Sequence, residues 1–155
     1  MRVIIYSIIF LILAGCGFKI VNQSENQRYK INEIEFKGEN RVNYFIKNKL
    51  LKKSNNESLN NEITLLVTTK KSKIIKEKNI KNEITKYQID IIIKVEFEEV
   101  GKSETYQLDL SKSGDFDVSN RYSQTLENEK KLTKLLTNDI TDDLLNLLIN
   151  KLNEL

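Results

Sequence analysis

A run of alternating residues from Tyr87 to Glu98 constrains the fold of this chain more than any other feature. Six apolar side chains occupy every second position of that run: Tyr87, Ile89, Ile91, Ile93, Val95 and Phe97. Because successive side chains of a strand point to opposite faces of the sheet, this pattern predicts a long strand with one buried face and one mostly wet face. A covering layer is therefore expected on one side of the sheet.

Shorter alternations predict three further strands, at Tyr29–Phe36, Ile63–Lys70 and Tyr106–Leu110. In the first of them the apolar alternation slips between Ile31 and Ile34. Gly101-Lys102-Ser103 separates the long strand from the one that follows it, which predicts an antiparallel hairpin. Loops are expected over residues 54–58 and 114–121.

Two segments have apolar residues three and four positions apart, the spacing of a helix that buries one face. The first runs from Arg41 to Lys53, after a turn in which Asn40 is suited to cap the helix. Its apolar positions are Val42, Phe45, Ile46 and Leu50. The second begins near Leu126 and extends for roughly 40 Å at 1.5 Å per residue. Its apolar positions are Leu132, Leu135, Leu136, Ile140, Leu144, Leu147, Leu148 and Leu152.

A helix of that length needs a packing partner, and the apolar face of the sheet is the obvious one. The order β-α-β-β-β-α therefore predicts a two-layer α/β sandwich of the α+β class. It has a mostly antiparallel four-stranded sheet with two helices on one face, in a single domain over residues 28–155.

The composition excludes most enzyme mechanisms. Among 155 residues there is no His and one Cys, which excludes His-based acid–base chemistry, catalytic triads, His or paired-Cys zinc sites and internal disulfides. Glu96, Glu98 and Glu99 are interpreted as solvated side chains at a strand end, and Asp115 and Asp117 as charges of a turn before a helix. No phosphate-binding or nucleophile-elbow motif occurs. We therefore expect no enzyme, no metal and no cofactor.

The charge is nearly balanced along the chain. Lys and Arg number 25 against 22 Asp and Glu, for a net charge of +3, whereas a nucleic-acid binder usually has a concentrated basic stripe. No nucleic-acid partner is therefore expected. The Lys-rich stretch from Lys70 to Lys81, whose charge is mostly unpaired in sequence, has two interpretations. It is a solvated hairpin tip, or it contacts phosphate or carboxylate groups such as those of an anionic lipid.

The first 15 residues have the pattern of a signal peptide. Arg2 precedes an apolar run from Val3 to Leu13, which is too short to span a membrane as a helix. It ends in Leu13-Ala14-Gly15-Cys16, which resembles a bacterial lipobox. We therefore expect covalent N-acyl and S-diacylglycerol lipid on Cys16, followed by a tether over residues 16–27. The alternatives are an ordinary signal peptide or an uncleaved anchor, with Cys16 incidental. Gly17 follows the cysteine instead of an Asp, which favours the periplasmic side of the outer membrane.

Several of these features occur together in one order: Ala14-Gly15-Cys16-Gly17-Phe18, the β-α-β-β-β-α order, the stretch from Thr85 to Ile91, and Gly114-Asp115-Phe116-Asp117 leading through Tyr122 into a charged helix. Together they resemble the LPS-assembly lipoprotein (LptE) family. The resemblance implies an outer-membrane lipoprotein that plugs the large β-barrel LptD. Such a protein assists barrel assembly, helps insert lipopolysaccharide (LPS) into the outer leaflet, and binds LPS itself.

In that family a basic residue in the loop before the third strand is implicated in lipid binding, and Lys81 is the matching residue. A second basic position of the family falls on or near Leu126 and is not matched. Two other functions remain open: an accessory envelope lipoprotein of a lipid-transporting ABC system, and a structural envelope lipoprotein without a lipid ligand.

Overall fold

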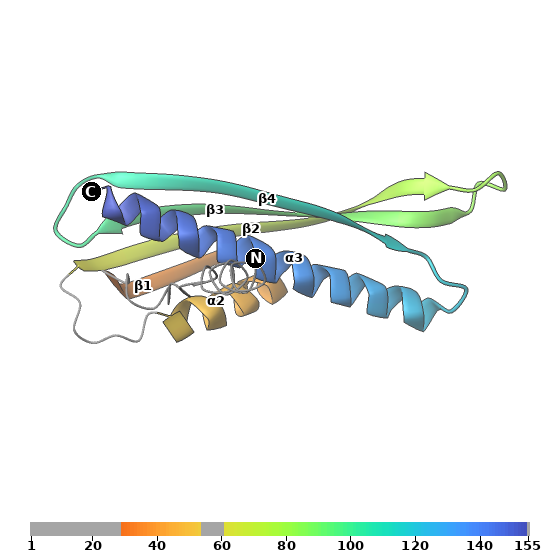
Figure 1. Ribbon diagram of the computed structural model, residues 1–155, viewed down its shortest axis with the longest axis horizontal. Helices are drawn as coiled ribbons and strands as arrows, with labels where there is room; N and C mark the ends of the chain where they lie inside the picture. Colours follow the sequence, from red (N-terminus) through yellow and green to blue (C-terminus); the bar gives the residue numbers. More distant parts are fainter. Residues whose placement is uncertain (1–28, 54–60, 155) are drawn as a thin grey trace, which may run out of the picture.

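The computed structural model describes residues 29–53 and 61–154. Its elements are β1 (Tyr29–Gly38), α2 (Asn40–Lys53), β2 (Asn61–Lys78), β3 (Ile84–Glu99), β4 (Thr105–Asp117) and α3 (Tyr122–Asn153). The strands form one sheet in the order β1-β2-β3-β4, parallel between β1 and β2 and antiparallel elsewhere. Both helices lie on the same side of the sheet (Figure 1). The predicted α+β architecture is therefore confirmed. The expected signal peptide, Cys16 and the tether lie outside the described residues.

The core follows the alternation of β3. Ile89, Ile91, Ile93, Val95 and Phe97 are all buried, together with Ile63, Leu65 and Val67 of β2 and Ile140, Leu144 and Leu148 of α3. The residues between them, such as Lys94, Glu96 and Glu98, are exposed on the opposite side. We call that side the open face, because no described element covers it. The sheet thus has one covered face and one open face, as the alternation of β3 predicted.

The connection from β1 through α2 to β2 joins two parallel strands, which requires a crossover element. At its start, the backbone N–H of Glu39 donates to Thr69 Oγ1 at 3.0 Å, and Thr69 Oγ1 donates to Asn43 Oδ1 at 2.6 Å. Asn40 is not the N-cap, because the carbonyl of Glu39 already accepts the N–H of Asn43 at 2.9 Å. The predicted slip in the first strand is confirmed as a register shift between Ile31 and Glu33.

Two strands are longer than the alternation predicts. β2 has 18 residues and contains most of the Lys-rich stretch, whereas β4 continues through Gly114 to Asp117, which was expected to be a loop. The physical reason is pairing with β3, which continues to the distal ends of both neighbours: Lys78 of β2 pairs with Ile84, and Asp117 of β4 pairs with Lys86. Pairing of this kind overrides the weak strand preference of Lys, Gly and Asp.

The helix α3 also differs from its predicted pattern. It begins at Tyr122 and not near Leu126, and Leu135 and Leu147 are 51% and 43% exposed. Its buried face instead includes Thr133, Thr137 and Thr141. These hydroxyls donate to the carbonyl four residues earlier, at 2.8, 2.7 and 2.5 Å, so each is satisfied inside the core. Within the described part of the chain, no helix is both long and apolar enough to span a bilayer.

Candidate functional site

The Lys-rich stretch forms the end of a hairpin that occupies one extreme of the long axis of the molecule (Figure 1). We define the distal hairpin as residues 70–86, which comprise the end of β2, the turn and the start of β3. It contains seven Lys and two Glu. A region of this charge is the candidate site for an anionic ligand, so the partners of each lysine decide what the hairpin can bind.

The lysines nearest the body of the protein are paired. Lys71 and Lys73 both contact Glu129 of α3, at 3.0 and 2.7 Å. The Lys73 ammonium also lies 4.4 Å from the ring centroid of Tyr87, and that ring stacks on Phe116. Burial alone would raise the pKa of Glu129, but the hydrogen bonds and charges of the two lysines outweigh it and hold this pKa below its ordinary value. This cluster fastens the sheet to α3.

Two more lysines of the hairpin are paired on the sheet itself. Lys76 is bound by Asp115 of β4, and Lys86 contacts Glu77 at 3.1 Å. The hydrogen bond and charge of Glu77 raise the pKa of Lys86. Three of the six lysines from Lys70 to Lys81 are therefore paired, and their partners come from β4 and α3, elements distant in sequence, and not from the neighbouring Glu77 and Glu83.

The turn of the hairpin is held by one side chain. Asn79 Oδ1 accepts the backbone N–H of Lys81 at 2.9 Å and that of Glu83 at 3.0 Å, and its amide donates to the Glu83 carboxylate at 2.7 Å. Asn82 has a φ of 63°, a conformation that Asn tolerates better than most residues. The turn thus has a defined shape and presents Ile80 and Lys81 at its tip.

Lys81 lies at this tip with an exposed side chain. In the described residues, the ammonium groups of the hairpin that form no ion pair are those of Lys70, Lys78 and Lys81. Lys78 Nζ donates to Asn82 Oδ1 at 3.0 Å, so it lies over the same turn as Lys81. The sequence-predicted contact residue is therefore at the end of the molecule and available to an anionic group. Ile80 beside it is fully exposed. It belongs to no helical or strand periodicity in the sequence, so the sequence pattern did not identify it as a candidate residue.

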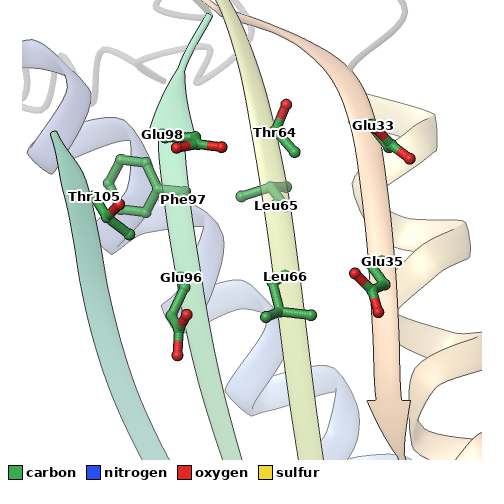
Figure 2. Close-up of a pocket in the computed structure, with 9 residues that line it drawn as sticks. All are labelled: Glu33, Glu35, Thr64, Leu65, Leu66, Glu96, Phe97, Glu98 and Thr105. Carbon is green, nitrogen blue, oxygen red and sulfur yellow. The ribbon is translucent and has the colours of Figure 1, made fainter. Parts of the chain in front are cut away.

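A second concave surface lies on the open face, toward the other end of the sheet. Figure 2 shows Glu33 and Glu35 of β1 and Glu96 and Glu98 of β3 on either side of Leu66. The concavity has a volume of about 330 Å³. Glu99, which was grouped with Glu96 and Glu98, points to the covered face instead, where it is nearly buried and contacts Lys102 at 2.6 Å. No metal-binding group of three or more acidic or Cys side chains occurs in residues 29–53 and 61–154.

Solved structures of bacterial lipoproteins share this fold. Rare lipoprotein B from Shewanella oneidensis superposes with a TM-score of 0.62 at 11% identity, covering 79% of this chain and 98% of that one. A minor lipoprotein from Acinetobacter baumannii superposes with a TM-score of 0.51 at 13% identity, covering 79% of this chain and 93% of that one. At such identities the similarity establishes the fold. No protein-family model matches the chain, and no curated protein matches its sequence.

Proposed function

We propose that this chain is an outer-membrane lipoprotein, anchored through lipid on Cys16, that plugs the LptD barrel of the lipopolysaccharide translocon. In this role it assists assembly of the barrel and insertion of LPS into the outer leaflet. It is not an enzyme and needs no cofactor beyond its covalent lipid.

One observation carries the proposal: the described domain has the fold of bacterial lipoproteins over nearly their whole length. The sequence independently has a stretch that resembles a lipobox, Leu13-Ala14-Gly15-Cys16, separated from this domain by the expected tether. Fold and anchor motif are separate features of the chain, and both belong to an envelope lipoprotein.

The open face supports the role as a plug. Residues that face the lumen of a membrane barrel are polar, so a plug needs a polar surface without a covering layer. The open face has this character, with Thr64, Lys94, Glu96 and Gln107 directed away from the helices. Its acidic concavity is suited to basic side chains of a barrel wall.

Affinity purification of the lipidated protein from its own membranes, followed by mass spectrometry, tests this function. We expect a stoichiometric, heat-modifiable β-barrel to copurify in detergent. Recovery of an ATPase complex in its place would indicate the accessory lipoprotein of a lipid-transporting ABC system. Recovery of folded, acylated protein alone would refute the plug function and leave a structural envelope lipoprotein.

The lipopolysaccharide contact is tested separately at Lys81. Charge reversal in Lys81→Glu is expected to weaken LPS capture on a surface about tenfold, because it replaces an attraction with a repulsion. Lys52→Glu, an exposed change on α2, is the matched control. Unchanged capture by Lys81→Glu would exclude this contact and leave the barrel proposal intact.

A further inference from the structure

We propose that the tip of the distal hairpin is a membrane wedge. In this proposal Ile80 enters the acyl layer of an anionic bilayer while Lys78 and Lys81 bind lipid phosphates at its surface. The inference rests on the proposed function in assuming that the protein works beside a membrane, and it shares Lys81 with the lipopolysaccharide contact proposed above. The proposal adds a second membrane attachment to the expected lipid anchor. This attachment lies at the end of the molecule formed by the β2–β3 turn (Figure 1).

The apolar part of the wedge is exposed in a way the fold does not explain. Ile80 is fully exposed at the tip, and Ile74 and Ile75, on the strand that leads to it, are each 49% exposed. Successive residues of a strand point to opposite faces, so Ile74 and Ile75 lie on both sides of the hairpin. A segment that enters a bilayer is surrounded by lipid on both sides, and this arrangement fits such surroundings.

The turn holds Ile80 in place before any ligand arrives. The Asn79 side chain accepts the backbone N–H groups of Lys81 and Glu83 at 2.9 and 3.0 Å and donates to the Glu83 carboxylate at 2.7 Å, which holds the tip in one shape. The backbone N–H of Asn79 also donates to the carbonyl of Glu83 at 2.9 Å. A preformed turn loses little conformational freedom when it binds, so the exposed isoleucine is ready to insert.

At the tip, two ammonium groups without an ion pair among the described residues, those of Lys78 and Lys81, face one carboxylate, Glu83, which accepts a hydrogen bond from the Asn79 amide, so the positive charges are in excess there. Lys78 and Lys81 form no ion pair with any described residue, whereas Lys71, Lys73, Lys76 and Lys86 are held by carboxylates. Of the three hairpin lysines without an ion pair in the described part of the chain, two, Lys78 and Lys81, lie beside Ile80, and the third, Lys70, lies farther down β2. Apolar residues flanked by lysines at an interface are the pattern by which proteins bind anionic lipid surfaces.

The dimensions of the tip favour a bilayer over a protein partner. A stable protein interface buries roughly 800 Å² on each partner, and a five-residue turn with one fully exposed apolar side chain offers far less. A bilayer accepts a narrow insertion of this kind. The acidic concavity of Glu33, Glu35, Glu96 and Glu98 lies about 40 Å from the tip along β2, at 3.3 Å per residue.

Because the chain has no Trp, Ile80→Trp introduces a single tryptophan, at the tip. The lipidated, full-length mature protein is reconstituted into vesicles of phosphatidylcholine with or without phosphatidylglycerol. We expect the indole emission to shift to shorter wavelength, and to be quenched by lipids brominated on their acyl chains, in the anionic vesicles. Leu51→Trp, a partly exposed position on α2, is the control and is expected to be neither shifted nor quenched.

In the same background, Lys78→Gln and Lys81→Gln are each expected to lower the inserted fraction about fivefold. Lys47→Gln, an exposed change on α2, is expected to have no effect. An unshifted indole in anionic vesicles would overturn the proposal, as would equal insertion in neutral and anionic vesicles. Insertion seen only after a barrel protein is added would identify the tip as a protein contact and overturn it too. The main experiment contains no barrel, so its result tests the membrane wedge alone. The plug function is tested by the copurification experiment, and either proposal can fail without the other.

Discussion

The tightest constraint on a single residue lies at Gly38, where β1 meets α2. Its φ is +94°, and a Cβ there would lie 1.9 Å from the carbonyl oxygen of Thr69. Both the backbone conformation and the approach of β2 therefore require glycine. Gly101, in the turn after β3, has a φ of +89°, but a Cβ there would have no neighbour within 4 Å. Substitution at Gly101 would therefore cause backbone strain alone, whereas substitution at Gly38 would cause both backbone strain and a clash with a neighbour.

Gly38→Ala is expected to destabilise the protein by about 3 kcal/mol, the sum of left-handed strain and overpacking. Gly101→Ala has the strain alone, so we expect a loss of about 1–2 kcal/mol. Urea denaturation followed by circular dichroism measures both. Equal losses in the two variants would show that the approach of Thr69 contributes nothing.

Glu129 makes stability depend on pH. Its carboxyl group has a pKa below the ordinary value of 4.5 in the folded protein, so its contribution is complete above that pH. The contribution is lost as pH falls through the lowered folded pKa. Glu129→Gln is expected to lower the free energy of unfolding by about 1–2 kcal/mol at pH 7, and this difference from wild type should shrink below about pH 4.5.

Denaturation at a series of pH values tests this expectation, with Glu127→Gln as the control. Glu127 is exposed on the same helix, and its replacement should change stability by less than about 0.5 kcal/mol at every pH. A Glu129→Gln difference that stays constant with pH would contradict the assigned role of its charge.

Among the elements, α3 depends on a small residue for its contact with β4. A Cβ at Gly114 would lie 2.9 Å from Leu132 Cδ1 and 3.3 Å from Leu136 Cδ2, so strand and helix meet where a side chain is missing. Lys112 and Asp143, at 2.6 Å, join the same two elements farther along. Close approach at Gly114 thus lets the N-terminal half of α3 lie against the sheet.

Gly114→Val should push this part of α3 away from β4 and lower the free energy of unfolding by about 1–3 kcal/mol. Ser111→Val is the matched control on the open side of the same strand, where the side chain is exposed. Thermal denaturation measures both variants. A Gly114→Val protein as stable as the control would mean that Leu132 and Leu136 move aside without cost.

At the scale of the whole molecule, charge is arranged along the long axis. The acidic concavity with Glu96 and Glu98 lies near one end of the open face (Figure 2), and the free ammonium groups of Lys78 and Lys81 lie at the other. If the chain plugs a barrel, these ends meet different surroundings, and each can be altered without touching the core.

Under the proposed plug function, the double substitution Glu96→Lys/Glu98→Lys is expected to reduce recovery of the barrel in native purification about tenfold, because reversed charges would repel a basic barrel surface. Both side chains are exposed, so the fold should survive, as circular dichroism would check. Glu127→Lys on α3 is the control. Full recovery with the double variant would place the barrel contact elsewhere.

The sequence alone determined the order of elements, the two faces of the sheet, the β3–β4 hairpin and the slip in β1. These features depend on side-chain periodicity and turn residues within short segments, so local physics suffices for them. It also located Lys81 in the loop before β3, and in the structure this residue lies at the exposed tip of the hairpin.

Only the tertiary structure decided which lysines are free. Lys71 and Glu129 are 58 residues apart in the chain, and no local pattern connects them. The same holds for the extension of β2 and β4, which follows from pairing with β3. Contacts between distant segments set these features, since a charge or a strand end is stabilised by its partner and not by its neighbours in sequence.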